Sequence, residues 1–200
     1  MNKIGILGGT FDPFHVGHLS VARAAREECA LTQVVLLPTK VQPFKLGHKM
    51  ADERDRVNMV SLVAEENEGF SVCTAEAYSE EVSYTYKTMK TLKDIYRNAG
   101  LYFIMGTDSF LSLENWYKGE ELLREFSFIV GMRPGYRENE TGEKAEELRS
   151  KYRAEIVLLH NRIVDVSSTE IKSNIKAGKS ISHLVPPPIE RYIYEHGLYK

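Results

Sequence analysis

Two histidines near the start of the chain have the types and spacing to act on a phosphoryl group. His15 and His18 lie three residues apart with Gly17 between them, and in a first helical turn they would share one face. Donors held there can stabilise charge on a phosphoryl group in transit without any protein nucleophile. The pair by itself is also typical of a chance helix start or of half a metal site. Its context therefore decides the interpretation.

The residues before the histidines favour a phosphate site. Lys3 to Leu7 is a short apolar run typical of a buried strand, and Gly8 and Gly9 follow it as a turn. Glycines let backbone N–H groups approach an oxyanion, and a helix end adds unpaired donors and partial positive charge. The stretch lacks the Gly-Lys-Ser/Thr of a Walker A loop and the Gly-x-Gly-x-x-Gly of a dinucleotide-binding turn. We therefore expect an anion cradle of another kind.

The elements that must position this cradle alternate along the chain. Apolar runs predict further strands, and amphipathic patterns predict helices between them. The expected strands are 33–37, 70–73, 101–105, 128–132 and 154–159, and the expected helices are 18–30, 52–67, 85–98, 122–126, 140–153, 165–178 and a short last one ending at 197. This alternation predicts an α/β fold with a doubly wound parallel sheet, in a single domain over residues 1–200.

The usual strand order of such sheets brings two glycine-containing segments together. In the order 3-2-1-4-5, the first and fourth strands are neighbours at the point where ligands bind. Gly8–His18 would then lie beside Gly106–Ser109. One nucleotide could extend across both segments.

The bulk properties argue against several classes of protein. A formal net charge of −2 over 200 residues argues against nucleic-acid binding by bulk electrostatics. Cys29 and Cys73 are far apart, which suits a reducing compartment. The first strand leaves no room for a signal peptide, and no apolar run approaches the ~20 residues of a membrane span. We expect a cytoplasmic protein with no nucleic-acid or membrane partner; whether it forms a homo-oligomer stays open.

The string from Gly8 to His18 resembles the signature of the HxGH nucleotidyltransferase superfamily, whose members move a nucleotidyl group from a nucleoside triphosphate onto a phosphate. Later motifs look like those of bacterial nicotinate-nucleotide adenylyltransferase, over essentially the whole chain. These motifs are Ser83–Thr85, Phe103–Asp108 with Trp116 downstream, Arg133–Gly135, Val166–Ile171 and Glu195–Tyr199. The resemblance implies a Rossmann-like nucleotidyltransferase fold. It also implies transfer of AMP from Mg-ATP to nicotinate mononucleotide (NaMN), giving deamido-NAD and pyrophosphate in NAD biosynthesis.

The resemblance also implies roles for individual residues. The catalytic pair would be His15 and His18, Asp108 would accept from the ribose hydroxyls, and Trp116 would stack on the pyridine ring. The positions implied for ATP are Gly8, Gly9, Thr10, Phe11, His15, His18, Gly106, Asp108, Ser167, Ser168, Thr169 and Lys172. Those implied for NaMN are Asp12, Lys45, Tyr84, Thr85, Trp116, Tyr117 and Arg133. Because the sequence offers no carboxylate cage, Mg²⁺ is expected to arrive with ATP.

Two positions depart from the family pattern. Lys172 stands where the family usually has Arg, which keeps the charge but loses the two-pronged phosphate grip. Phe44 precedes Lys45 where many relatives have His. The lysine-rich segment 38–50 is of a kind that is usually only solvated, but it follows a strand beside the cradle, so we expect phosphate contacts from Lys40 and Lys45.

Several other functions stay open at this point. A phosphopantetheine adenylyltransferase would carry Thr at position 15 and be shorter, and a cytidylyltransferase would need another base pocket. A class I aminoacyl-tRNA synthetase would need a Lys-Met-Ser-Lys-Ser loop and far more chain. A dual-specificity relative would accept nicotinamide mononucleotide (NMN) equally. A non-catalytic nucleotide-sensing module would bind ATP without releasing pyrophosphate.

Overall fold

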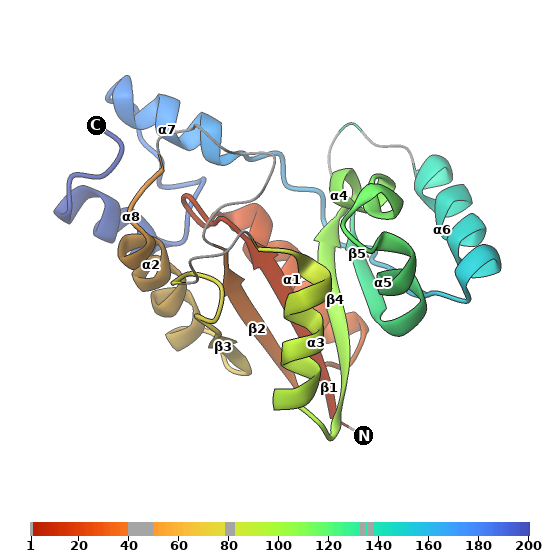
Figure 1. Cartoon of the computed structure of the whole chain (residues 1–200). Coiled ribbons are helices and arrows are strands. Elements are labelled where there is room, and N and C mark those ends of the chain that lie inside the picture. Colours follow the sequence, from red (N-terminus) through yellow and green to blue (C-terminus); the bar gives the residue numbers. More distant parts are fainter. Residues whose placement is uncertain (1, 40–49, 79–82, 133–134, 136–137) are drawn as a thin grey trace.

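The sheet has the predicted strand order. The computed structural model describes residues 2–39, 50–78, 83–132, 135 and 138–200. Within these residues six strands form one all-parallel sheet in the order β3-β2-β1-β4-β5-β6 (Figure 1). Their bounds are β1 Asn2–Gly9, β2 Gln33–Pro38, β3 Phe70–Val72, β4 Ala99–Gly106, β5 Ser127–Gly131 and β6 Glu155–Leu158. The prediction of a doubly wound α/β sheet is therefore confirmed.

Helices connect the strands and end close to the predicted positions. The α-helices are α1 Val16–Glu28, α2 Glu53–Glu65, α3 Thr85–Ile95, α4 Thr107–Leu111, α5 Gly119–Glu125, α6 Glu138–Tyr152, α7 Ser168–Lys176 and α8 Pro187–Glu195, with a 3₁₀ turn η2 at Leu113–Asn115. Sequence patterns did not predict α4 or η2, because five and three residues are too few to show the i, i+3, i+4, i+7 spacing of an amphipathic helix. Both α4 and α7 lie at the end of the sheet opposite the N-terminus (Figure 1).

Each face of the sheet carries its own hydrophobic core. Side chains alternate along a strand, so Ile6 and Val35 lie on one face and Leu7 and Leu36 on the other. The first face packs against α3, α5 and α6, and the second against α1, α2, α7 and α8. Burial of both faces explains the continuous apolar character of the strands. The carboxyl ends of β1 and β4 are left at one edge of the two cores, where the site lies.

A buried arginine joins the carboxyl ends of β1 and β2. Arg56 of α2 has no exposed surface, and its Nη1 donates to the carbonyl oxygens of Thr10 at 2.7 Å and Thr39 at 2.6 Å. Burial lowers the pKa of Arg56, and the negative charge of Asp12 acts in the opposite direction by raising it. The sequence predicted apolar residues on the inner face of α2, and it gave no sign that this cation faces inward.

Candidate active site

The two histidines meet where β1 passes into α1. His15 is the N-cap residue of α1, with an extended backbone, and His18 is the third residue of the helix. The His15 N–H donates to Nδ1 of His18 at 3.2 Å, and the His18 N–H donates to Nδ1 of His15 at 3.4 Å. This is a reciprocal capping box. The prediction that both residues lie within the first helical turn is therefore corrected: His15 stands just before it, because its side chain caps the helix.

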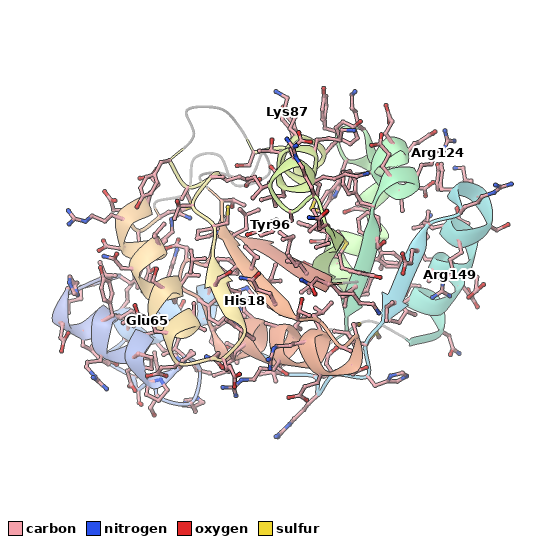
Figure 2. All side chains as sticks on the ribbon, turned by 90° about the horizontal axis from the view of Figure 1, so that it is seen from below. His18, Glu65, Lys87, Tyr96, Arg124 and Arg149 are labelled. Atoms are coloured by element: carbon pink, nitrogen blue, oxygen red, sulfur yellow. The ribbon has the colours of Figure 1, made fainter. Side chains whose placement is uncertain are left out.

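The capping contacts fix which ring nitrogen of each histidine carries the proton. The two rings stack with their centroids 3.6 Å apart and 24° between their planes. In a neutral imidazole, an Nδ1 that accepts a hydrogen bond leaves the proton on Nε2. Both histidines therefore carry an Nε2–H donor. His15 is buried and His18 half-buried. In Figure 2, His18 lies near the middle of the molecule, whereas Lys87 and Arg124 lie at its edge.

Gly17 makes the stacked arrangement possible. A Cβ at this position would lie 3.0 Å from Nδ1 and 3.1 Å from Cε1 of His15. Such a contact is too short for a carbon against a ring that is already held by a cap and a stack. The glycine therefore leaves room for the imidazole of His15.

Two cavities share a wall at His18. The smaller encloses about 240 Å³ and the larger about 580 Å³. Both are lined by the same four residues, which are Leu7, His18, Gly106 and Asp108. The predicted adjacency of the Gly8–His18 and Gly106–Ser109 segments is therefore observed, because β1 and β4 pair directly.

The smaller cavity brings together part of the set expected to bind ATP. His15, Gly17 and Ser167 line it in addition to the shared residues. Ser167 is the N-cap of α7, and its Oγ accepts from the Glu170 N–H at 3.1 Å. Ser168 and Thr169 are not among the described residues that line either cavity; the Ser168 hydroxyl donates to the Pro13 carbonyl at 3.0 Å. This bond attaches the start of α7 to the loop that carries the histidines.

The larger cavity contains the aromatic and helix-start residues expected to bind NaMN. Tyr84, Thr85, Trp116 and Tyr117 line it, as do Gly8 and Gly9, which the resemblance had grouped with ATP. The Tyr84 and Tyr117 rings lie 4.7 Å apart, and Nε1 of Trp116 donates to the Ser112 hydroxyl at 3.3 Å. Tyr84 is the N-cap of α3 and makes no side-chain capping bond. The first N–H groups of α3 are therefore not capped by the Tyr84 side chain.

The remaining predicted residues pack beneath the site or lie outside the described residues. Thr10 and Phe11 are buried, and the Phe11 ring contacts that of His18 edge-on at 5.2 Å. Asp12 is buried and paired with Lys172. Lys40, Lys45 and Arg133 lie outside the described residues, so their predicted contacts stay predictions.

Sequence reasoning missed two buried polar side chains in the wall of the larger cavity. Thr39 and Glu76 line it, each with 7% of its surface exposed. Among the described residues, Oγ1 of Thr39 and Oε2 of Glu76 have no hydrogen-bond partner. Burial raises the pKa of Glu76. Glu76 comes from a turn between β3 and α3 that has no periodic pattern, so nothing in the sequence pointed to it.

The described part of the chain lacks two further features. It contains no group of three or more His, Cys, Asp or Glu side chains arranged to hold a metal ion. None of its helices is both long and apolar enough to cross a membrane.

Comparison with known proteins supplies the family. A family model described as "Cytidylyltransferase-like" matches residues 6–174. A protein of Desulfitobacterium hafniense named "Probable nicotinate-nucleotide adenylyltransferase" is 39% identical over 203 residues, which cover 99% of this chain and 96% of that one. A protein of Clostridium botulinum with the same name is 37% identical over 201 residues, covering both chains completely. The chain belongs to the nicotinate-nucleotide adenylyltransferase family.

A solved structure agrees with this family in fold. The nicotinic acid mononucleotide adenylyltransferase of Plasmodium falciparum, complexed with NaAD, superposes with a TM-score of 0.79 at 21% identity. The match covers 100% of this chain and 98% of that one. At this identity the likeness shows the fold, and the full-length curated relatives carry the family assignment.

Proposed function

We propose that the protein transfers the AMP group of ATP to NaMN, forming deamido-NAD and releasing pyrophosphate. The observation that carries the proposal is the wall shared by the two cavities, formed by Leu7, His18, Gly106 and Asp108. Adenylyl transfer requires the α-phosphate of one nucleotide to lie beside the 5′-phosphate of another. The full-length relatives named for this activity support the same conclusion.

The chemistry needs positioning and charge neutralisation rather than a general base. A 5′-phosphate oxygen of NaMN, already ionised near neutral pH, attacks the α-phosphorus of ATP. The bond from that phosphorus to the oxygen bridging the α- and β-phosphates breaks, and the electron pair leaves with pyrophosphate. The Nε2–H groups of His15 and His18 would donate to oxygens that gain charge in the transition state. Their capping contacts hold the rings in place before the substrates arrive.

Magnesium enters this proposal as part of Mg-ATP. The described residues offer no cluster of carboxylates and histidines for a resident ion, and Mg²⁺ usually binds through substrate phosphates with few protein ligands. In the bound nucleotide the ion would neutralise the charge of the triphosphate. The chain's own contribution is the pair of histidine donors and the start of α3, which the Tyr84 side chain does not cap.

The larger cavity suits a pyridine ring that carries an acid. Trp116 offers a face for stacking, and the start of α3 at Thr85 offers N–H groups and a positive dipole end for a carboxylate. A carboxamide would set its own N–H₂ against those donors, at about 1–3 kcal/mol for each buried group left unpaired. Two such mismatches correspond to roughly 10²- to 10⁴-fold in kcat/KM. We therefore expect the protein to prefer NaMN to NMN.

One coupled assay tests the function. Purified protein is given Mg-ATP and NaMN, pyrophosphate release is followed, and the dinucleotide product is identified by mass. Omitting either substrate should abolish release. CTP in place of ATP, or phosphopantetheine in place of NaMN, distinguishes the other nucleotidyltransferases. ATP binding without pyrophosphate release would instead indicate a nucleotide-sensing module, and equal kcat/KM for NaMN and NMN a dual-specificity enzyme.

The two cysteines are consistent with a protein that works in a reducing compartment. Cys29 and Cys73 are both free thiols, and substrates such as ATP and a pyridine mononucleotide are metabolites of the cytoplasm. We propose that the protein works there. Localisation of a tagged copy tests this directly, and secretion of the protein would contradict it.

A further inference from the structure

The chain between β6 and α7 forms one wall of the smaller cavity, where the proposed function places ATP. Residues 161, 162 and 164–167 line this cavity, and so does Met132, which follows β5. Residues 159–167 belong to no helix or strand, so no regular ladder of hydrogen bonds holds them. The position of this wall segment, residues 161–167, therefore depends on contacts made by individual side chains.

A single side-chain amide continues the hydrogen bonding where the β5–β6 ladder ends. The Leu159 N–H donates to the Val130 carbonyl at 2.9 Å, as in a parallel ladder. Two residues further along, the Met132 N–H donates to Oδ1 of Asn161 at 2.8 Å. The Met132 carbonyl accepts from Nδ2 of the same asparagine at 3.2 Å. The amide of Asn161 thus replaces a peptide group beside Met132.

This arrangement uses both protons of the Asn161 amide. Nδ2 of Asn161 also donates to the Arg162 carbonyl at 3.2 Å. Because an amide nitrogen has two protons, both are donated to backbone carbonyls. Asn161 keeps no N–H for a ligand, although it lines the cavity. Any effect of its amide donors on ATP must therefore pass through the wall segment.

The wall segment also lies against the helix that carries His18. A Cβ on Gly17 would lie 3.6 Å from the Val164 carbonyl oxygen, so the segment passes close to the start of α1. The Ser20 hydroxyl of α1 donates to the Arg162 carbonyl at 3.3 Å. That bond is exposed, whereas the two bonds between Asn161 and Met132 are buried. Asn161 is therefore the attachment whose loss costs more, since it would leave buried polar groups unpaired.

We propose that Asn161 is a positioning residue for ATP: its side chain ends the ladder beside Met132, so that the backbone can leave the sheet and form the cavity wall. The inference rests on the proposed function in placing ATP in the smaller cavity. Without the amide, the buried N–H and carbonyl of Met132 lose their partners, and the segment must shift or admit water. Either change moves the wall. NaMN is expected in the larger cavity, which neither Asn161 nor Met132 lines.

The experiment compares Asn161→Leu with the matched variant Asn67→Leu. Leucine is close to asparagine in size, adds no charge beside the triphosphate and forms no side-chain hydrogen bond. The Asn67 amide also joins distant segments, because it accepts from Arg23 at 2.7 Å and donates to the Val63 carbonyl at 2.7 Å. It lines neither cavity of the site.

ATP binding and steady-state kinetics give the first measurement. By calorimetry, Asn161→Leu should raise the Kd for ATP by roughly tenfold, the effect of buried backbone groups left unpaired. Its KM for ATP should rise in parallel, while kcat and the KM for NaMN stay close to wild-type values, because only ATP binding is weakened. Asn67→Leu should match the wild type in all four values.

Deuterium exchange separates positioning from direct contact with ATP. Without ATP, peptides covering the wall segment should exchange faster in Asn161→Leu than in the wild type, and peptides of β1 should not. A residue that only touched ATP would leave this exchange unchanged. If Asn161→Leu does not fold, Asn161→Ala admits water beside Met132, and the same loss of ATP affinity and faster exchange are expected.

The contrary results are distinct. A wild-type Kd for ATP in a folded Asn161 variant, or unchanged exchange of the wall segment, would overturn the proposal. An equal rise in the KM for NaMN, or the same loss in Asn67→Leu, would show a general loss of structure and would also overturn it. If the wild type binds ATP but releases no pyrophosphate, the proposed function fails, and calorimetry still decides the role of Asn161. A wild type that binds no ATP would refute both.

Discussion

Lys172 of α7 forms an ion pair with Asp12, a residue of the loop between β1 and α1 that lies 160 positions earlier in the chain. Asp12 also accepts from the Tyr199 hydroxyl at 2.8 Å and from the Ala51 N–H at 3.0 Å. Nζ of Lys172 lies 5.1 Å from the centre of the Tyr199 ring. Burial and the nearby Asp12 charge raise the pKa of Tyr199, so this hydroxyl stays a donor. One buried carboxylate thus ties α7 and the C-terminal residues to the loop that carries His15.

Lys172 has two alternative roles, and substitution separates them. If it replaces the phosphate-binding arginine of the family, Lys172→Ala should raise the KM for ATP several-fold and leave that for NaMN unchanged, while Lys172→Arg should be tolerated. If it serves only Asp12, Lys172→Ala should instead lower the free energy of unfolding by about 3–5 kcal/mol, because a buried charge loses its partner. Steady-state kinetics and urea unfolding of both variants are the measurements. Unchanged ATP kinetics would show that Lys172 only pairs with Asp12 of the loop and does not bind ATP.

The catalytic contribution of His18 can be measured separately from ATP binding. His18→Ala removes one preorganised donor and should lower kcat by roughly 10²-fold or more. ATP affinity, followed by calorimetry, should fall much less. Because His18 also caps α1, thermal unfolding of the variant serves as the control for loss of structure. Near-normal turnover in a folded variant would show that the histidine is only a cap.

Trp116 should provide affinity without discrimination. Its ring is half-buried in the wall of the larger cavity and stacks equally well on an acid or an amide. Trp116→Ala should raise the KM for NaMN and for NMN alike, by roughly tenfold. The ratio of the two kcat/KM values should survive. A collapse of that ratio would mean that the tryptophan, rather than the start of α3, selects the acid.

The ion cluster around Glu114 should make stability depend on acid pH. Hydrogen bonds from Lys144, Lys151 and Tyr152 hold the pKa of Glu114 at about 2, below its ordinary 4.5. Its contribution is therefore present above pH 4.5 and is lost as the pH falls from 4.5 toward 2.

Replacement of Glu114 measures this contribution. Glu114→Gln should lower the free energy of unfolding by about 1 kcal/mol at pH 7, a value suited to a partly exposed cluster. The difference from wild type should shrink near pH 3. Glu146→Gln, which breaks an exposed pair with Arg149 in the same helix, is the matched control and should change stability little at either pH. An equal loss of unfolding free energy at both pH values would contradict a lowered pKa of Glu114.

The sequence by itself determined the strands, the longer helices and the order of the strands in the sheet. Apolar runs and helical periodicity are local, and right-handed crossovers leave few ways to arrange alternating strands and helices. The strands at 33–37 and 101–105 therefore appear where they were expected, and the Gly8–His18 segment lies beside Gly106–Ser109. Family motifs supplied the residue roles, which stay predictions, including those of Lys45 and Arg133 outside the described residues.

Only the tertiary structure decided which hydrogen-bond or ion-pair partner each polar group has. His15 became an N-cap through a reciprocal bond with His18, Arg56 turned inward to two carbonyls, and Lys172 paired with Asp12. Glu76 entered the wall of the larger cavity from a turn without any pattern. Hydrophobic periodicity can be read from the sequence because the preference of a side chain for water or for the core is a property of that residue alone. A hydrogen-bond partner depends on which distant segment packs alongside, and that is set only when the chain has folded.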